Sequence, residues 1–179
     1  MPAARDVLAY IQERMPELGI TAAFKLLYYS QAWNLAWNGK PLFPERIEAW
    51  ERGPVAARTW RETQGRVHGP PPKNLAEHDR HVVDSIIAFY GHHPVRDLVD
   101  MTHSEIPWAD ARRGLPEGAS SNEEVTQHSM RRYFTRLAMR GGSMPRRPQR
   151  VVTPSDEDVR RIAAEEAPKW RTTLERLAE

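Results

Sequence analysis

The segment from Phe24 to Val55 constrains the fold of this chain more than any other. Its first half has helical spacing on two adjacent stripes, of which one comprises Ala23, Leu27, Ser30 and Asn34 and the next comprises Phe24, Tyr28, Gln31 and Leu35. A helix whose neighbouring stripes are both suited to burial has little face left for solvent. We therefore expect the Phe24–Trp37 helix to run through the core, with the other elements packed around it.

Local signals mark the ends of this helix and the elements after it. Thr21 is the expected N-cap, because its hydroxyl can accept a hydrogen bond from a free amide of the first turn. Asn38-Gly39 should end the helix, since both residues tolerate positive φ. The segment Arg46–Trp50 alternates polar and apolar residues and predicts a short, half-buried strand. Gly53-Pro54 should start the next helix, with proline at the first helical position. Gly53 should lie where the strand turns sharply into this helix, at positive φ.

The spacing elsewhere predicts further helices and no internal repeat. The expected helices cover about residues 3–15, 54–64, 74–91, 94–103, 104–114 and 126–140. Val95 should face inward, and Ser104 and Thr126 should cap the helices that they start. Trp33, Trp50 and Trp60 fall on helical or strand faces that should be buried. The fold should be mainly α: a compact helical bundle around a central buried helix, with a small β-strand element and a C-terminal helical appendage. We expect a domain at 1–141, a basic linker at 142–154 and the appendage at 155–179.

Composition excludes several classes of protein. The chain of 179 residues has no cysteine, so disulfides, zinc–thiolate sites and cysteine nucleophiles are ruled out. No apolar run approaches the roughly 18 residues of a membrane helix, and the N-terminus lacks the apolar region of a signal peptide. We expect a soluble, cytoplasmic protein. The net charge of +2 is too small to indicate nucleic-acid binding by itself.

Several short motifs occur in one order along the chain. They are Lys25–Tyr28, Pro41–Phe43, Ile47–Trp50 with Gly53–Val55, and Thr102–Trp108. This ordered set resembles the Panacea domain, the SocA-like antitoxin domain of prokaryotic toxin–antitoxin pairs, over roughly residues 5 to 140. The resemblance implies stoichiometric binding and neutralisation of a cognate protein toxin, without turnover or a cofactor. It also leaves open an adaptor role, in which the antitoxin delivers its toxin to a protease.

His103, Glu105 and Trp108 form the most concentrated polar and aromatic motif. One interpretation is a hydrolytic dyad of His103 and Glu105. The alternative is that both side chains satisfy backbone groups at a helix–helix junction while Trp108 packs, as is common at caps and turns. The Panacea resemblance supports the second interpretation, because it implies no catalysis at this motif. We therefore expect no enzymatic activity.

Histidines raise the question of a metal site. His78 and His81 are three residues apart on one expected helix, and His92 and His93 lie just beyond its end. Two such histidines can share a metal, but a site also needs a third convergent ligand. Solvent-facing histidines on the polar side of the helix are the favoured interpretation, and we predict no metal site.

The C-terminal third is rich in arginine. Arg132, Arg136 and Arg140 are spaced by four and form one row on the expected 126–140 helix. Such a row is compatible with phosphate contacts, and a nucleic-acid-binding regulator that uses the 131–150 region is one alternative. No helix-turn-helix is evident and no aromatic residues interleave with the arginines, so a solvated basic face or an acidic protein partner is favoured.

The appendage needs a surface on which to dock, because so short an amphipathic segment is marginal alone. That surface belongs to its own domain, to a second copy in a homo-oligomer, or to a partner. An isolated Trp such as Trp170 often marks a contact of this kind. The residues predicted to contact a partner are His103, Glu105, Trp108, Arg132, Arg136, Arg140, Ile162, Trp170 and Leu174.

Overall fold

The computed structural model describes residues 1–67, 75–116, 118–149, 160–161 and 164–165. Residues Met1–Pro148 form one compact unit and Gln149–Glu179 a second. In the second unit, residues 160–161 and 164–165 are helical. The predicted contact residues Ile162, Trp170 and Leu174 lie outside the described residues.

The described residues of the first unit confirm a mainly α fold. A two-stranded antiparallel sheet pairs Glu48 with Val55, Ala49 with Pro54 and Trp50 with Gly53. The elements in chain order are α1 (Ala4–Arg14), α2 (Ile20–Asn38), β1 (Glu48–Trp50), β2 (Gly53–Val55), α3 (Ala57–Thr63), α4 (Glu77–Tyr90), α5 (Val95–Ser104), α6 (Ile106–Ala111) and α7 (Gln127–Arg140).

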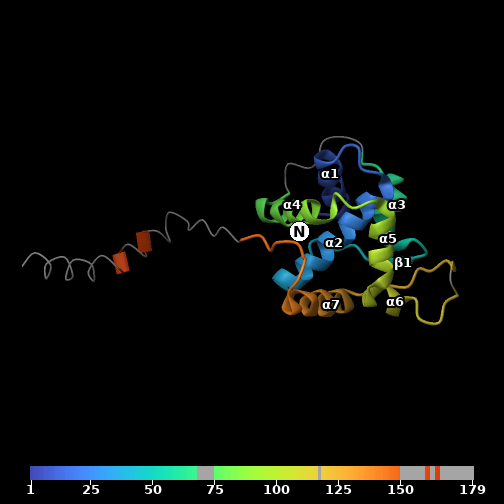
Figure 1. Cartoon of the computed structure of the whole chain (residues 1–179). Helices are drawn as coiled ribbons and strands as arrows, with labels where there is room; N and C mark the ends of the chain where they lie inside the picture. The colour runs from blue at the N-terminus through green and yellow to red at the C-terminus, as the bar shows by residue number, and fades with distance from the viewer. Residues whose placement is uncertain (68–74, 117, 150–159, 162–163, 166–179) are drawn as a thin grey trace, which may run out of the picture. The chain divides into compact units, whose positions relative to one another are not determined.

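Helix α2 occupies the centre of this unit, as its two-stripe pattern predicts. It packs against α1, α4, α5, α7 and β2, and Figure 1 shows α7 on one side of it with α1 and α4 on the other. Every residue from Ala22 to Leu35 is buried, so no side of this part of the helix faces solvent. The other helices supply apolar side chains to the same core, among them Leu8, Val83, Leu98 and Phe134.

Buried polar residues of α2 find partners within the unit. The Gln31 Oε1 accepts hydrogen bonds from the backbone N–H of Leu42 and of Phe43, and its Nε2 donates to the Phe43 carbonyl. Trp33 Nε1 donates to the Tyr90 hydroxyl at 3.1 Å. Because these groups are satisfied, their burial avoids the cost of unpaired donors and acceptors. Gln31 also anchors the segment that leads from α2 to the sheet.

Two predicted helix boundaries are confirmed. Helix α2 ends at Gly39, which adopts the left-handed conformation with φ +70°. Thr126 caps α7, because its hydroxyl oxygen accepts a hydrogen bond from the Ser129 N–H at 3.1 Å. A threonine hydroxyl at a helix start and a glycine at a helix end are the residues that such boundaries favour.

Other boundary predictions were wrong. The N-cap of α2 is Gly19, whose extended backbone leads into the helix at Ile20, so Thr21 lies inside the first turn. Pro54 belongs to β2, and α3 starts only at Ala57. The two-stranded pairing explains this difference, since a proline without an N–H is accepted where a strand has an unpaired edge. Tertiary pairing overrode the helix-start signal of Gly53-Pro54.

The junction around α5 also differs from expectation. Val95, predicted to face inward, is 49% exposed. Ser104 does not cap α6: its hydroxyl donates to the Met101 carbonyl, and the N-cap position belongs to Glu105. The reason is that α5 continues to Ser104, so one residue alone separates it from α6.

The burial of the tryptophans predicts unequal effects on stability. Trp33 is fully buried and packs edge-on against Phe134 at 5.2 Å, whereas Trp50 is only partly buried. We expect Trp33→Ala to lower the free energy of unfolding by about 3–5 kcal/mol and Trp50→Ala to lower it by less. Urea denaturation of the two variants checks the order, and equal losses would contradict the core described above.

Candidate functional site

A buried carboxylate lies where α5 meets α6. Glu105 has extended backbone angles between the two helices, and its side chain enters the core with 6% of the residue exposed. The Tyr28 hydroxyl donates to Oε2 at 2.8 Å, and the Tyr29 hydroxyl donates to Oε1 at 2.9 Å. The prediction that Glu105 satisfies backbone groups was therefore wrong, because its partners are two tyrosines of the central helix.

Lys25 contributes a second buried charge from the preceding turn of α2. It is 1% exposed, and its Nζ donates to the Arg52 carbonyl at 2.5 Å. Burial lowers the pKa of Lys25 to about 7, and the nearby Glu105 charge opposes this change. Burial raises the pKa of Glu105 to about 7, with the tyrosine hydrogen bonds and Lys25 acting in the other direction. Each group thus favours the ionised state of the other.

The tyrosines remain hydrogen-bond donors. Burial, followed by the Glu105 charge, raises the pKa of both Tyr28 and Tyr29. Tyr29 also stacks on Tyr90 of α4 with ring centroids 3.9 Å apart and planes 3° from parallel, and Phe134 of α7 meets both rings of α2 edge-on. The network around Glu105 therefore links the central helix to α4, α5, α6 and α7.

The β1–β2 turn closes over Lys25. Gly53 has φ +103°, as its predicted place in a sharp turn requires. A Cβ added to Gly53 would lie 2.0 Å from Lys25 Nζ and 2.8 Å from Thr102 Oγ1. Both the backbone conformation and the space above the lysine therefore require glycine at this position.

His103 and Trp108 form a separate stack beside the sheet. Their ring centroids are 4.0 Å apart with planes 7° from parallel, and Trp108 Nε1 donates to the Trp50 carbonyl at 3.0 Å. His103 Nε2 is buried and has no hydrogen-bond partner among the residues that the structure describes. Burial, followed by the Lys25 charge, lowers the pKa of His103. The structure shows no hydrogen bond between His103 and Glu105, so the hydrolytic dyad considered from the sequence is not formed.

The predicted arginine row lies on the surface. Arg132, Arg136 and Arg140 are all exposed on α7, and none pairs with an acidic side chain in the described part of the chain. Arg132 and Arg136, with His128, line a shallow cleft of about 390 Å³ beside the end of α2.

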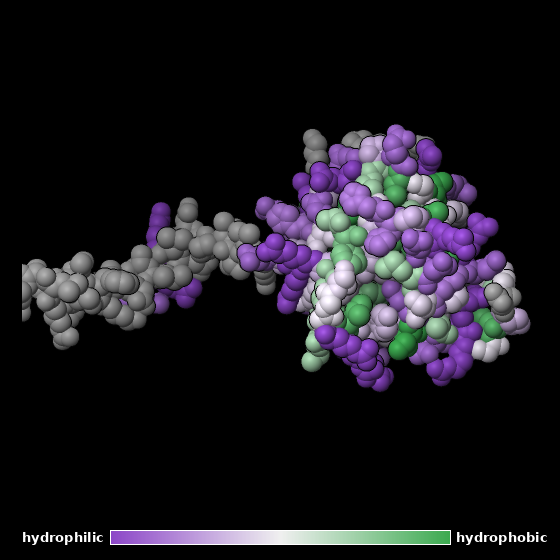
Figure 2. Space-filling model, in the orientation of Figure 1, coloured by the Kyte–Doolittle hydropathy of each residue, from purple (hydrophilic) through white to green (hydrophobic). Residues whose placement is uncertain are grey.

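In the view of Figure 2, hydrophilic residues cover most of the unit, and apolar residues show only in small separate areas.

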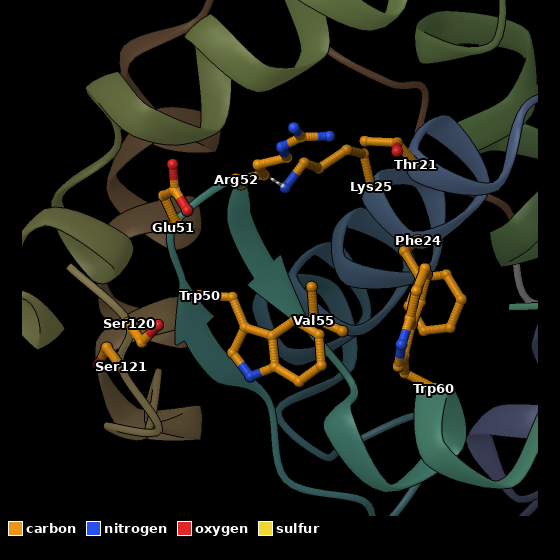
Figure 3. A pocket seen from close by; sticks show the side chains of 10 residues that line it. All are labelled: Thr21, Phe24, Lys25, Trp50, Glu51, Arg52, Val55, Trp60, Ser120 and Ser121. Carbon is orange, nitrogen blue, oxygen red and sulfur yellow. Dashed lines mark hydrogen bonds between the residues drawn. The ribbon is translucent and has the colours of Figure 1, made fainter. Parts of the chain in front are cut away.

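Sequence reasoning missed a pocket beside the sheet. Its volume is about 480 Å³, and Figure 3 shows Phe24, Trp50 and Trp60 among the side chains that line it. The Trp50 and Trp60 rings meet edge-on, with centroids 6.1 Å apart. The lining residues are Thr21, Phe24, Lys25, Trp50, Glu51, Arg52, Val55, Trp60, Ser120 and Ser121. Periodicity assigned both tryptophans to the core, yet each is only partly buried. Their proximity depends on the turn between the strands and on α3, which no local pattern encodes.

The described residues hold neither a cluster of metal-binding side chains nor a helix suited to cross a membrane. Nowhere in that part of the chain do three or more histidine, aspartate or glutamate side chains come together in a way that could hold a metal ion. His78 instead lies 3.1 Å from the Asn38 amide, and His81 lies 3.9 Å from Glu77. Among the same residues, no helix combines the length and apolar character that a bilayer crossing needs.

Comparison with known proteins gives one match. The family model of the antitoxin SocA-like Panacea domain matches residues 24–109. This range contains most of α2, both strands, α3, α4, α5, and therefore Lys25, Gly53 and Glu105. The resemblance predicted from the ordered motifs is confirmed over this range. Neither the curated proteins nor the solved structures gave a match.

The contact between Gly53 and Lys25 predicts a large effect of a single methyl group. Gly53→Ala should lower the free energy of unfolding by about 3 kcal/mol or more, because it combines positive-φ strain with displacement of a buried, hydrogen-bonded amine. Gly39→Ala is the matched control: Gly39 also has positive φ, but no atom of the described residues lies within 4 Å of an added Cβ. Its cost should be about 1 kcal/mol. If urea denaturation shows that both substitutions lower the free energy of unfolding equally, the close approach of Gly53 to Lys25 is refuted.

Burial of Glu105 predicts a pH dependence. Its pKa rises from 4.5 to about 7 on folding, so the native protein binds more protons in this window. The free energy of unfolding therefore loses up to about 1.4 kcal/mol per pH unit as pH rises from 4.5 to 7. Glu105→Gln removes this loss, so its stability relative to wild type should increase with pH.

Urea denaturation at four pH values between 4.5 and 7 measures this trend. Glu17→Gln serves as the control, because Glu17 is exposed, and its profile should follow that of the wild type. Parallel profiles for Glu105→Gln and wild type would show that the carboxyl does not titrate differently on folding.

Proposed function

Because residues 24–109 belong to the SocA-like Panacea domain family, we propose that this protein is the antitoxin of a toxin–antitoxin pair. It binds a cognate protein toxin directly in the cytoplasm and neutralises it by occlusion. The match to the family is the observation that carries this proposal. The antitoxin acts stoichiometrically, without turnover, and its affinity comes from complementary surfaces.

The internal chemistry of the domain supports binding rather than catalysis. Both oxygens of Glu105 accept hydrogen bonds from tyrosines inside the core, and Lys25 Nζ is bonded to a backbone carbonyl. His103 stacks on Trp108 and is not hydrogen-bonded to Glu105. A nucleophile, a base and an orienting group within reach of one another are what a hydrolytic site needs. The polar residues of the motif therefore serve the fold in this proposal.

The exposed arginine row is the surface that we assign to electrostatic contact with the toxin. Arg132, Arg136 and Arg140 have no acidic partner in the described part of the chain, so an acidic surface of the toxin can pair with them without breaking existing ion pairs. Glu105 affects binding only indirectly, because it is buried. His103 and Trp108 form a rigid stack beside the sheet and are partly exposed.

Co-expression with the neighbouring reading frame tests the proposed function. Induction of that frame alone should arrest growth, and induction of this chain with it should restore growth. The two purified proteins should form a complex of fixed stoichiometry. If the neighbour arrests growth and this chain neither binds it nor restores growth, the proposal is wrong. Rescue that disappears in a strain lacking its cytoplasmic proteases would indicate the adaptor role.

A charge variant tests the assigned surface in the same assay. Replacing Arg132, Arg136 and Arg140 by serine should weaken the complex about tenfold, because three exposed ion pairs contribute about 0.5 kcal/mol each. The control replaces Arg5, Arg66 and Arg96, which are also exposed, and removes the same charge. If both variants weaken binding equally, net charge rather than this row is responsible. Retention of DNA by the wild type that salt abolishes would favour the nucleic-acid alternative.

A further inference from the structure

The pocket beside the sheet has preformed aromatic walls. Phe24 meets Trp60 edge-on with centroids 5.1 Å apart and planes 66° apart, and Trp50 meets Trp60 at 6.1 Å and 70°. Trp50 Nε1 donates to the Glu48 carboxylate at 2.9 Å, so the orientation of its ring is fixed. Aromatic rings at such angles offer both a face and an edge to an incoming ring.

The opposite wall is held by backbone pairing. Ser120 and Ser121 lie on the segment before α7, which runs beside β1. Ala49 N–H donates to the Glu123 carbonyl at 2.8 Å, and Val125 N–H donates to the Ile47 carbonyl at 2.9 Å. Both walls are therefore positioned in the absence of an occupant, which lowers the entropic cost of binding.

One edge of the pocket is cationic. Figure 3 shows the Arg52 side chain extending over Lys25 toward Thr21, whereas Glu51 lies away from this edge. Arg52 is exposed and forms no ion pair with another described residue, while its carbonyl accepts the hydrogen bond from Lys25. A guanidinium beside aromatic rings can bind a ligand group that carries both an aromatic ring and a carboxylate.

We propose that this pocket receives an aromatic side chain of the toxin, with a toxin carboxylate facing Arg52. This inference rests on the proposed function and identifies an anchor for the complex. The volume of about 480 Å³ lies within the range of roughly 300–1,000 Å³ that ligand pockets span, and it accommodates one large ring with its adjoining backbone. Interface anchors are commonly aromatic side chains in such preformed pockets.

Two small probes test the chemistry of the pocket without the toxin. N-acetyl-L-tryptophan carries a ring and a carboxylate, whereas N-acetyl-L-tryptophanamide carries the ring alone. Titrations followed by NMR of the ¹⁵N-labelled full chain should move the indole N–H signals of Trp50 and Trp60. The acid should bind at least threefold more tightly than the amide. Arg52→Gln should remove this difference, because it leaves the backbone carbonyl that holds Lys25 in place.

Filling the pocket tests its role in neutralisation. Ser120→Trp adds a ring at an exposed position of the pocket wall and should abolish probe binding and lower toxin affinity at least tenfold. Ser143→Trp is the matched control, since Ser143 is also exposed and does not line the pocket. A thermal midpoint near that of wild type shows that each variant is folded.

The outcomes separate this inference from the proposed function. If neither probe binds, or if Ser120→Trp neutralises the toxin as well as Ser143→Trp does, the pocket is not an anchor, although the antitoxin assignment stands. If the acid and the amide bind equally, the role of Arg52 is refuted. If wild-type protein fails to neutralise the neighbouring gene product, the proposed function fails and this inference fails with it.

Discussion

The structure depends on burying a carboxylate and an amine inside an aromatic core. Removing these charges from water is costly unless partners replace the solvent. Here, Tyr28 and Tyr29 donate to Glu105, and the Arg52 carbonyl accepts from Lys25. The hydrogen bonds join the central helix to the α5–α6 junction and to the turn between the strands. The network therefore sets the positions of elements that are far apart in sequence.

This network also shapes the surface beside the sheet. Gly53 must lie directly over Lys25, which determines the course of the β1–β2 turn. Trp50 then projects from the sheet, its carbonyl accepts from Trp108, and its indole binds Glu48. A pocket results beside Trp50 and Trp60, outside the core but supported by it. Binding surfaces built on rigid elements in this way preserve their geometry without an occupant.

Some features of the site were predictable from local patterns, and others were not. The positive φ of Gly53 and the exposure of the row Arg132, Arg136 and Arg140 follow from turn chemistry and helical spacing. The partners of Glu105 did not follow, because Tyr28 and Tyr29 lie more than 70 residues earlier in the chain. Likewise, the Gly53-Pro54 signal for a helix start was overridden by strand pairing. Local propensity predicts secondary structure poorly wherever pairing between distant segments competes with it.

The sequence by itself determined the mainly α class, the central place of α2 and the match of residues 24–109 to the Panacea family model, because helical periodicity and ordered motifs are local properties of the chain. Only the tertiary structure decided that Glu105 is buried among tyrosines, that His103 stacks on Trp108, and that Trp50 and Trp60 together line a pocket. These features are contacts between distant segments. Their geometry depends on how helices and strands pack, which no spacing within a single element specifies.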